Sequence, residues 1–302
     1  MPDSYDHWST HFIVNKYKEP TSAGRFVSEI YFLEKIMRHG VRILDVGCAT
    51  GGLYFWLQER YKDFSYVGID VSEPLIKRAR ELWPNTNFFL SDIFTIKGID
   101  PRASSGLNLS SKTRSNSQQA TRYLPFVVSS LGRSKSKLPL RSSLATIKNP
   151  ALAKPFDVVV ATGLFQHEPR YKEMLQEMLK HVKDGGHVLF DVKLVHIHES
   201  VCDLNKSYGD HGDHRVYYIL LNFEDFKRWV FSSKDSIDSL EVYGYYADVN
   251  FSARLPTTLK ERVVSAHVLI QKKASEHSGD PKTVFSLPEE FVTDGYFGKE
   301  NL

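Results

Sequence analysis

A glycine-rich segment between a predicted strand and a predicted helix constrains the fold of this chain more than any other feature. In residues 41–57, VRILDVGCATGGLYFWL, branched aliphatic residues lead to Asp45, and three glycines follow between Gly47 and Gly52. Glycine adopts positive φ without strain and lets a ligand approach the backbone closely. A helix that begins near Gly52 points unpaired N–H groups and the positive end of its dipole at the same place. The segment therefore predicts a strand, a turn shaped to hold a small ligand, and a helix.

Strand and helix patterns alternate along most of the remaining chain. The unbroken apolar run at 158–161 is typical of a strand buried on both faces of a parallel sheet. The last two predicted strands, 239–249 and 262–273, have no helical pattern between them, which indicates an antiparallel hairpin. We therefore expect an α/β fold, with a doubly wound, mostly parallel seven-stranded sheet, helices on both faces and an antiparallel edge hairpin. The other strands are predicted at 41–46, 66–70, 87–92, 156–162 and 186–194, and the helices at 28–39, 53–60, 73–82, 170–182 and 223–231.

One long segment interrupts this alternation. Residues 101–156 hold five Lys and five Arg but no Asp or Glu, so they carry +10, and the other residues carry −7 of the net charge of +3. A serine-rich, basic stretch of this length is typical of a flexible insertion, and we expect 101–154 to be dispensable for folding. The chain then divides into an N-terminal helical or lid segment (1–40), a domain (41–273) interrupted at about 97–154, and a tail (274–302).

The composition indicates a soluble, cytoplasmic protein. Hydrophobic residues make up 41% of the chain, enough for a sizeable core. No apolar run approaches the roughly 18 residues that a membrane span requires, and the N-terminus shows no signal-peptide pattern. Two cysteines, Cys48 and Cys202, are too few for a disulfide framework or a cysteine-built zinc site.

The glycine turn by itself leaves the type of ligand open. Proteins that bind NAD or FAD also place glycines between a strand and a helix, and they also carry an acidic residue after the second strand, where this chain has Asp70. The segments that follow disfavour an NAD-dependent dehydrogenase. In order along the chain, five segments resemble the five motifs of the class I S-adenosylmethionine-dependent methyltransferases: LDVGCATG (44–51), VGIDVS (67–72), FLSD (89–92), FDVVVATGLFQH (156–167) and VKDGGHVLFDV (182–192).

This resemblance implies a Rossmann-like methyltransferase fold, S-adenosyl-L-methionine as cofactor and S-adenosyl-L-homocysteine as product. By analogy, the glycine turn lines the methionine portion, Asp45 contacts its amino group and Asp70 holds the ribose hydroxyls. Asp92 accepts from the adenine amino group. Ala49 stands at the middle glycine place of the motif, where its methyl group narrows the approach. The cofactor-binding residues implied are Asp45, Gly47, Ala49, Gly51, Asp70, Val71, Asp92, Ile93, Thr162 and Gly163.

His167 is the candidate catalytic residue. It lies just past a buried predicted strand, at the edge where doubly wound sheets bind ligands. A histidine acts as a general base near neutral pH, and many members of the family have one in this loop. The alternative is a structural histidine at the entry to the next helix.

Two polar segments are the candidates for the acceptor pocket. The first, 193–203, contains His-x-His and nearby carboxylates, and the second, 207–218, reads as a mobile loop with glycine hinges. Such a histidine cluster is more often a solvated loop than a metal site, so we expect no metal. The substrate-contacting residues predicted are His196, His198, His211 and Arg215.

The expected function is methyl transfer to a small-molecule or carbohydrate acceptor, at a hydroxyl oxygen. A nucleic-acid substrate is disfavoured because ATGLFQH (161–167) lacks the Asn/Asp-Pro-Pro-aromatic pattern of base-methylating enzymes, and because no stacking motif interleaves the basic residues. The alternative function is a non-catalytic, donor-binding regulatory protein whose basic insertion contacts an acidic partner.

Overall fold

The structure is a computed structural model that describes residues 11–21, 25–96, 151–211, 214–246, 253–274 and 279–293. Most of the predicted insertion therefore lies outside the described residues. Its last residues, 151–154, are described, and Leu152 among them is buried in the core. This burial argues against the expectation that the whole of 101–154 is dispensable for folding.

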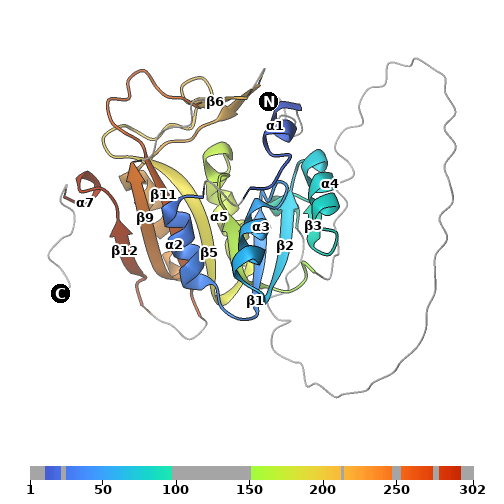
Figure 1. The fold of residues 1–302 in the computed structure, drawn as a ribbon. Coiled ribbons are helices and arrows are strands. Elements are labelled where there is room, and N and C mark those ends of the chain that lie inside the picture. Colours follow the sequence, from blue (N-terminus) through green and yellow to red (C-terminus); the bar gives the residue numbers. More distant parts are fainter. Residues whose placement is uncertain are drawn as a thin grey trace, which may run out of the picture.

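One large, mostly parallel sheet organises the molecule (Figure 1). All seven predicted strands are present, and the predicted hairpin is confirmed: its two strands pair antiparallel, and the second pairs antiparallel with the fifth predicted strand. The order across the sheet is β12 (Lys282–Ser286), β9 (Ile237–Tyr246), β11 (Val264–Lys272), β5 (Val182–Val195), β4 (Phe156–Ala161), β1 (Val41–Val46), β2 (Phe64–Asp70) and β3 (Asn87–Leu90), with β8 (Leu221–Asn222) paired to β5.

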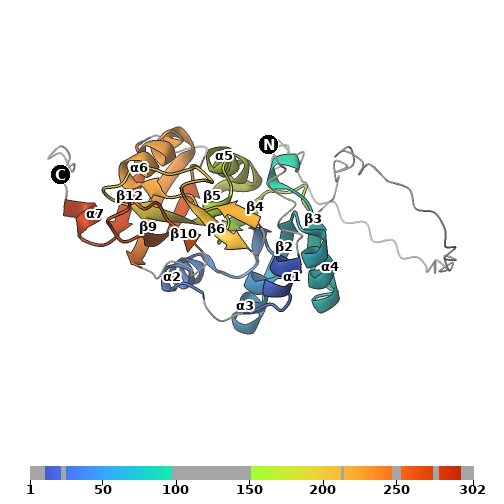
Figure 2. The same ribbon diagram turned by 90° about the horizontal axis from the view of Figure 1, so that it is seen from above.

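Helices cover both faces of this sheet, which confirms the doubly wound architecture (Figure 2). On one face lie α2 (Val27–Ile36), α3 (Gly52–Arg60) and α4 (Glu73–Leu82), and on the other lie α5 (Tyr171–His181) and α6 (Phe223–Phe231). Each helix buries residues at helical spacing; in α3 these are Leu53, Trp56 and Leu57. Because the apolar strands β4 and β1 lie at the centre, they are buried from both sides.

Two features near the end of the chain were not predicted. Within the segment read as a mobile loop, β6 (Tyr208–His211) and β7 (His214–Tyr217) pair antiparallel, and β10 (Ala253–Arg254) completes a small three-stranded sheet. We call this sheet the cap, because it lies beyond the edge at which β5 ends (Figure 1). In the tail, β12 adds a parallel strand beside β9, and α7 (Glu290–Thr293) follows it.

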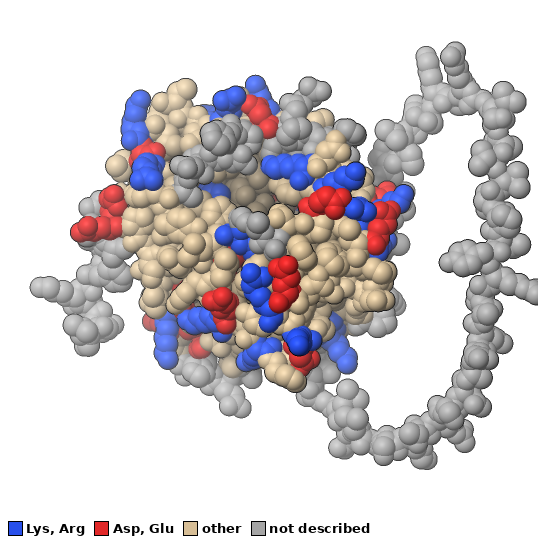
Figure 3. All heavy atoms as spheres, viewed as in Figure 1, with Lys and Arg blue, Asp and Glu red and all other residues tan. Residues whose placement is uncertain are grey.

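The surface of the described residues carries both signs of charge. On the face seen in Figure 3, Lys and Arg side chains lie next to Asp and Glu side chains. Ion pairs such as Lys35–Glu241, at 2.6 Å, account for part of this pattern. In the described part of the chain, no helix combines the length and apolar character needed to cross a lipid bilayer.

Candidate functional site

A cavity of about 170 Å³ lies where β1, β2, β3 and β4 end. Because these four strands are parallel, their carboxyl ends meet at one edge of the sheet, and the loops that follow them line the cavity. The lining residues are Tyr17, Val46, Gly47, Ala49, Ile69, Asp70, Val71, Leu75, Ser91, Asp92, Ile93, Phe94, Thr162, Gly163, Leu164, His167, Glu168 and Met174.

The turn after β1 has the left-handed backbone that its glycines predict. Gly47 has φ +76°, Gly51 has φ +89°, and Ala49 has φ +47°, a positive value that is rare for residues other than glycine. A Cβ at Gly51 would lie 2.9 Å from Phe88 Cζ, so this glycine is required by packing. Gly47 and Ala49 line the cavity, whereas Gly51 does not. The structure therefore separates ligand-facing positions of the turn from one that supports it.

Asp70 stabilises this turn directly. Its Oδ2 accepts a hydrogen bond from the Ala49 amide at 2.9 Å, and its Oδ1 accepts one from the Ser72 amide at 2.8 Å. The first of these bonds holds Ala49 in its left-handed conformation. Burial raises the pKa of Asp70, and the amides oppose this effect. The carboxylate thus ties the ends of β1 and β2 together at the cavity wall.

Asp45 lies behind the turn and is not among the cavity-lining residues. Its Oδ2 accepts the hydroxyl proton of Tyr66 on the neighbouring strand. Burial raises the pKa of Asp45 to about 7, although the Tyr66 hydrogen bond and Arg25 lower it. In this structure Asp45 is a buried partner of Tyr66, and its contact with the amino group of the methionine portion stays a prediction.

The other predicted cofactor residues line the cavity. Asp92 caps a short 3₁₀ turn, where its Oδ1 accepts from the Phe94 amide at 3.0 Å. Val71 and Ile93 contribute apolar walls from the ends of β2 and β3, and Thr162 and Gly163 come from the turn after β4. The predicted cofactor residues thus bring two carboxylates, two apolar side chains and the left-handed turn to one cavity.

His167 lies in a 3₁₀ turn, Phe165–His167, that follows β4, and it lines the same cavity. Its Nδ1 is 2.6 Å from the carbonyl oxygen of Tyr217, at the end of β7. Because a carbonyl oxygen only accepts hydrogen bonds, Nδ1 carries a proton, and when the ring is neutral the lone pair is on Nε2. This tautomer makes Nε2 the basic nitrogen.

Glu168 is a cavity residue that the sequence interpretation missed. It is buried, and burial raises its pKa to about 7 while the Arg170 amide lowers it. Its Oε1 accepts from the Arg170 backbone amide at 2.9 Å. Its position directly after His167 was the available signal. Tyr17, from the N-terminal segment predicted as helical or a lid, also lines the cavity. Its carbonyl oxygen accepts from the Thr50 hydroxyl at 2.7 Å, which ties this segment to the glycine turn.

Of the four predicted substrate residues, the three whose side chains the structure describes, His196, His198 and Arg215, lie outside this cavity. His198 lines a second cavity of about 810 Å³, formed mainly by residues 198–208 and 254–258, which we call the cap cavity. Its Nδ1 donates to the Glu199 carbonyl at 2.8 Å and its Nε2 accepts from the Thr258 hydroxyl at 2.9 Å. The ring of His196 packs against Phe291 instead. The Arg215 guanidinium lies 4.3 Å from the Tyr208 ring centre, and the His211 side chain lies outside the described residues.

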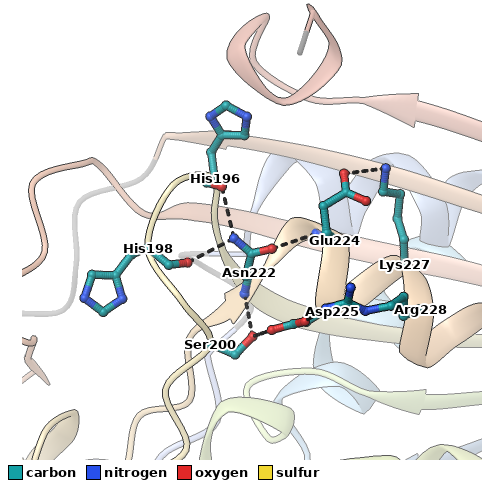
Figure 4. A network of polar contacts seen from close by, with 8 residues as sticks. All are labelled: His196, His198, Ser200, Asn222, Glu224, Asp225, Lys227 and Arg228. Carbon is teal, nitrogen blue, oxygen red and sulfur yellow. Dashed lines mark hydrogen bonds and ion pairs between the residues drawn. The ribbon is translucent and has the colours of Figure 1, made fainter. Parts of the chain in front are cut away.

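The peptide 196–198, which leads into the cap cavity, is fixed from two sides. Asn222 Nδ2 donates to the carbonyl oxygens of His196 and His198, both at 3.0 Å, while its Oδ1 accepts from the Glu224 amide (Figure 4). The Glu261 carboxylate accepts from the amides of all three residues of the peptide. Figure 4 shows both imidazole rings directed away from Asn222. Among the described residues, no three His, Cys, Asp or Glu side chains come together as a metal site.

Comparison with known proteins identifies relatives of this chain. Residues 18–236 match a family model described as a methyltransferase domain. Protein 235L of Invertebrate iridescent virus 6, whose name places it among methyltransferases, is 31% identical over 70 residues; these are 23% of this chain and 26% of that protein. The chain therefore spans about a quarter of this curated relative.

Solved structures similar to this chain are also found. A SAM-dependent methyltransferase from Methanosarcina mazei is 10% identical with a TM-score of 0.47, over 80% of this chain and 97% of the other. TehB from Haemophilus influenzae is 14% identical with a TM-score of 0.46, over 89% and 67%. The N-terminal domain of EvdMO1, solved with SAH bound, is 12% identical with a TM-score of 0.45, over 86% and 94%.

Proposed function

Because this chain belongs to the S-adenosylmethionine-dependent methyltransferases, with well over half of its length matched by their domain model, we propose that its acceptor is a small molecule or sugar methylated at a hydroxyl oxygen. The observation that carries this proposal is the tautomer of His167. The Tyr217 carbonyl holds the proton on Nδ1, and Nε2 then accepts a proton from an acceptor hydroxyl in the same cavity.

The residues around the cavity fit the methyl donor. Asp70 retains acceptor capacity beyond its bonds to the Ala49 and Ser72 amides, because each carboxylate oxygen has two lone pairs. It would accept the ribose hydroxyls. Val71 and Ile93 would enclose the adenine ring, and Asp92 would accept from its amino group. The left-handed backbone at Gly47 and Ala49 would admit the methionine portion.

The chemistry needs little from the protein beyond position and proton transfer. When bound, the donor would supply a methyl group on a positively charged sulfur; the acceptor oxygen would form a bond to the methyl carbon, and sulfur would keep the electron pair of the broken carbon–sulfur bond. The segment after β4 contributes both Leu164 and His167 to the cavity wall, so it would set the position of the base relative to the donor. In-line placement of the two reacting atoms provides most of the acceleration.

The cap cavity supports a small polar acceptor. Its lining includes cations, carboxylates, hydroxyls and amides, the groups that bind sugars and other hydroxylated molecules. Cys202 lines the cap cavity, where burial, and after it the charge of Asp203, raises the pKa of its thiol. We propose that the acceptor enters from the cap cavity, which these polar groups line.

Calorimetric titration with S-adenosylhomocysteine tests the donor part of this proposal. We expect binding by the unaltered protein and a roughly 10- to 100-fold loss in Asp70→Ala, the effect of removing charge-assisted hydrogen bonds. Asp63→Ala is the matched control, because Asp63 is an exposed carboxylate just before the other end of β2. Tight binding of NAD in place of S-adenosylhomocysteine, or an equal loss in both variants, would contradict the assignment.

A further inference from the structure

Two buried ion pairs lie on either side of the turn that follows β4. On one side, Arg25 pairs with Glu29 of α2, and on the other, Lys193 pairs with Asp191 of β5 at 3.3 Å. Glu29 is 4% exposed and Asp191 is 2% exposed. Burying such ions costs several kcal/mol each unless their hydrogen bonds are satisfied. Their further partners therefore indicate what they do.

Each carboxylate holds one group of the turn. Glu29 Oε1 accepts from the Thr162 hydroxyl at 3.0 Å, and Asp191 Oδ1 accepts from the Gly163 amide at 2.6 Å. Gly163 has φ +73°, with no heavy atom within 4 Å of where a Cβ would stand, so its conformation and not its packing calls for glycine. Consecutive residues of one turn are thus held by carboxylates from two separate elements.

Further contacts join these elements to each other. Lys193 Nζ donates to the Ser265 hydroxyl at 3.1 Å, and His267, opposite Asp191 in the β5–β11 pairing, lies 2.8 Å from the Ser28 hydroxyl through Nδ1. Burial lowers the pKa of His267 to about 4, so the ring is neutral near pH 7. Ser28 belongs to α2 beside Glu29, and the contacts therefore connect α2, β4, β5 and β11.

The turn held in this way forms one wall of the donor cavity. Thr162, Gly163 and Leu164 all line that cavity, whereas Glu29 and Asp191 do not. Leu164 lies over the glycine turn, since a Cβ at Gly47 would stand 3.1 Å from Leu164 Cδ2. The 3₁₀ turn that carries His167 begins directly after Leu164. A shift of Thr162 or Gly163 would therefore displace both Leu164, which contacts the glycine turn, and His167, the proposed base.

We propose that Glu29 and Asp191 are positioning residues that hold the turn 162–164 against the glycine turn and so keep the donor cavity formed before ligand binds. The assignment of this cavity to the methyl donor rests on the proposed function. The hydrogen bonds from Glu29 and Asp191 to the turn do not depend on which ligand the cavity binds.

The test compares Asp191→Asn and Glu29→Gln with Asp157→Asn. Both amide replacements retain an oxygen that accepts from the turn but remove the charge that Lys193 or Arg25 neutralises. Asp157 lies at the opposite end of β4, pairs with Lys183 and accepts from the Arg42 amide at 2.9 Å, so it is a matched carboxylate away from the cavity. Glu29→Gln keeps the comparison available if Asp191→Asn folds poorly.

Hydrogen exchange of the 162–167 amides without ligand is the first readout, and titration with S-adenosylhomocysteine is the second. We expect exchange about tenfold faster and binding roughly 5- to 20-fold weaker in both cavity-side variants than in Asp157→Asn at similar thermal stability. Exchange and affinity equal to the control would overturn the proposal, and so would faster exchange with unchanged affinity. If the unaltered protein failed to bind S-adenosylhomocysteine, the donor assignment would fall, and exchange alone would decide whether the carboxylates hold the turn.

Discussion

At the scale of single residues, the tautomer of His167 gives the clearest prediction. The Tyr217 carbonyl fixes the proton on Nδ1, so the proposed base is Nε2. His167→Ala should lower turnover with a hydroxylated acceptor by about 10²- to 10⁴-fold, the usual contribution of general base catalysis. Affinity for S-adenosylhomocysteine should stay within about threefold, because donor contacts come from other residues. The measurement is S-adenosylhomocysteine formation over pH 6–9 with a panel of hydroxylated acceptors.

His39→Ala is the control for that experiment, since His39 is an exposed histidine that pairs with Asp63 and does not line the cavity. Turnover by His167→Ala that equals the unaltered protein at every pH would exclude the base role.

Asp45 gives a prediction about stability. Its pKa of about 7 in the folded protein lies above the value near 4 of an exposed aspartate, because burial disfavours the charge. Between these values the folded state keeps a proton that the unfolded chain has released, so the free energy of unfolding falls as pH rises from about 4 to 7 and levels off above. Asp45→Asn should remove this pH dependence, so at pH 8 its free energy of unfolding should exceed that of the unaltered protein by on the order of a few kcal/mol.

Urea denaturation of both proteins at pH 4, 5.5, 7 and 8 measures this effect. The asparagine oxygen still accepts from Tyr66, so the packing is retained. Parallel stability curves for the two proteins would show that Asp45 is charged in the fold.

The sequence located most cavity residues because the motifs follow strand ends, and strand ends meet at one edge. Asp70, Asp92 and His167 were found in this way. Asp45 and Gly51 belong to the same motif but do not line the cavity. Asp45 accepts a hydrogen bond from Tyr66, and Gly51 packs against the rings of Trp83 and Phe88. A motif does not reveal which face a side chain takes. The role of Glu29 was beyond reach because its contact with Thr162 joins segments more than a hundred residues apart. The contact of Asp191 with the Gly163 amide spans 28 residues and depends on how β5 pairs with β4.

At the scale of elements, long apolar strands and amphipathic helices were predictable and short polar strands were not. The periodicity of 41–46, 73–82 and 223–231 matches β1, α4 and α6 residue for residue. β6 and β7 have only four residues each, YGDH and HRVY, with no apolar alternation. They form strands because they pair with each other and with β10, a tertiary effect that outweighs local preference.

The C-terminal elements give a prediction at this scale. Phe291 of α7 is 6% exposed and packs edge-to-face against Phe223 at the start of α6, while Val284 of β12 is 53% exposed. Phe291→Ala should lower the free energy of unfolding by about 3 kcal/mol, the usual effect of emptying a buried aromatic site. Val284→Ala should change it by at most about 0.5 kcal/mol. Chemical denaturation measures both values. Equal small effects would mean that α7 does not dock on the domain.

For the whole molecule, the structure redraws the boundary of the long insertion. Leu152 is buried in the core, and the Arg42 guanidinium donates to the carbonyl oxygens of Ala151, Lys154 and Pro155. A chain lacking 101–150 keeps these contacts, and a chain lacking 101–154 loses all of them except the bond to Pro155. We expect the second deletion to be less stable than the first by about 3 kcal/mol, the usual cost of losing a buried leucine.

Thermal unfolding of the two deletion variants, each closed by the same short glycine-serine linker, checks this expectation. The melting temperature of the variant lacking 101–150 should nearly equal that of the intact chain. Equal stability of both deletions would show that 151–154 contribute nothing, and aggregation of the shorter deletion would show that 101–150 pack against the domain.

The hydrogen bonds that fix the peptide 196–198 have a consequence for the proposed acceptor site: they limit which of its groups can recognise an acceptor. Glu261 already occupies its three amides, and Asn222 occupies the carbonyl oxygens of His196 and His198. Little of this backbone is left to bind a visiting molecule, so recognition here depends on side chains. Exposed positions such as Ile197 and Glu199 accept new side chains while the main chain stays in place. Under the proposed use of the cap cavity as the acceptor site, single substitutions at positions such as Glu199 would change selectivity while the backbone of the cavity wall stays in place.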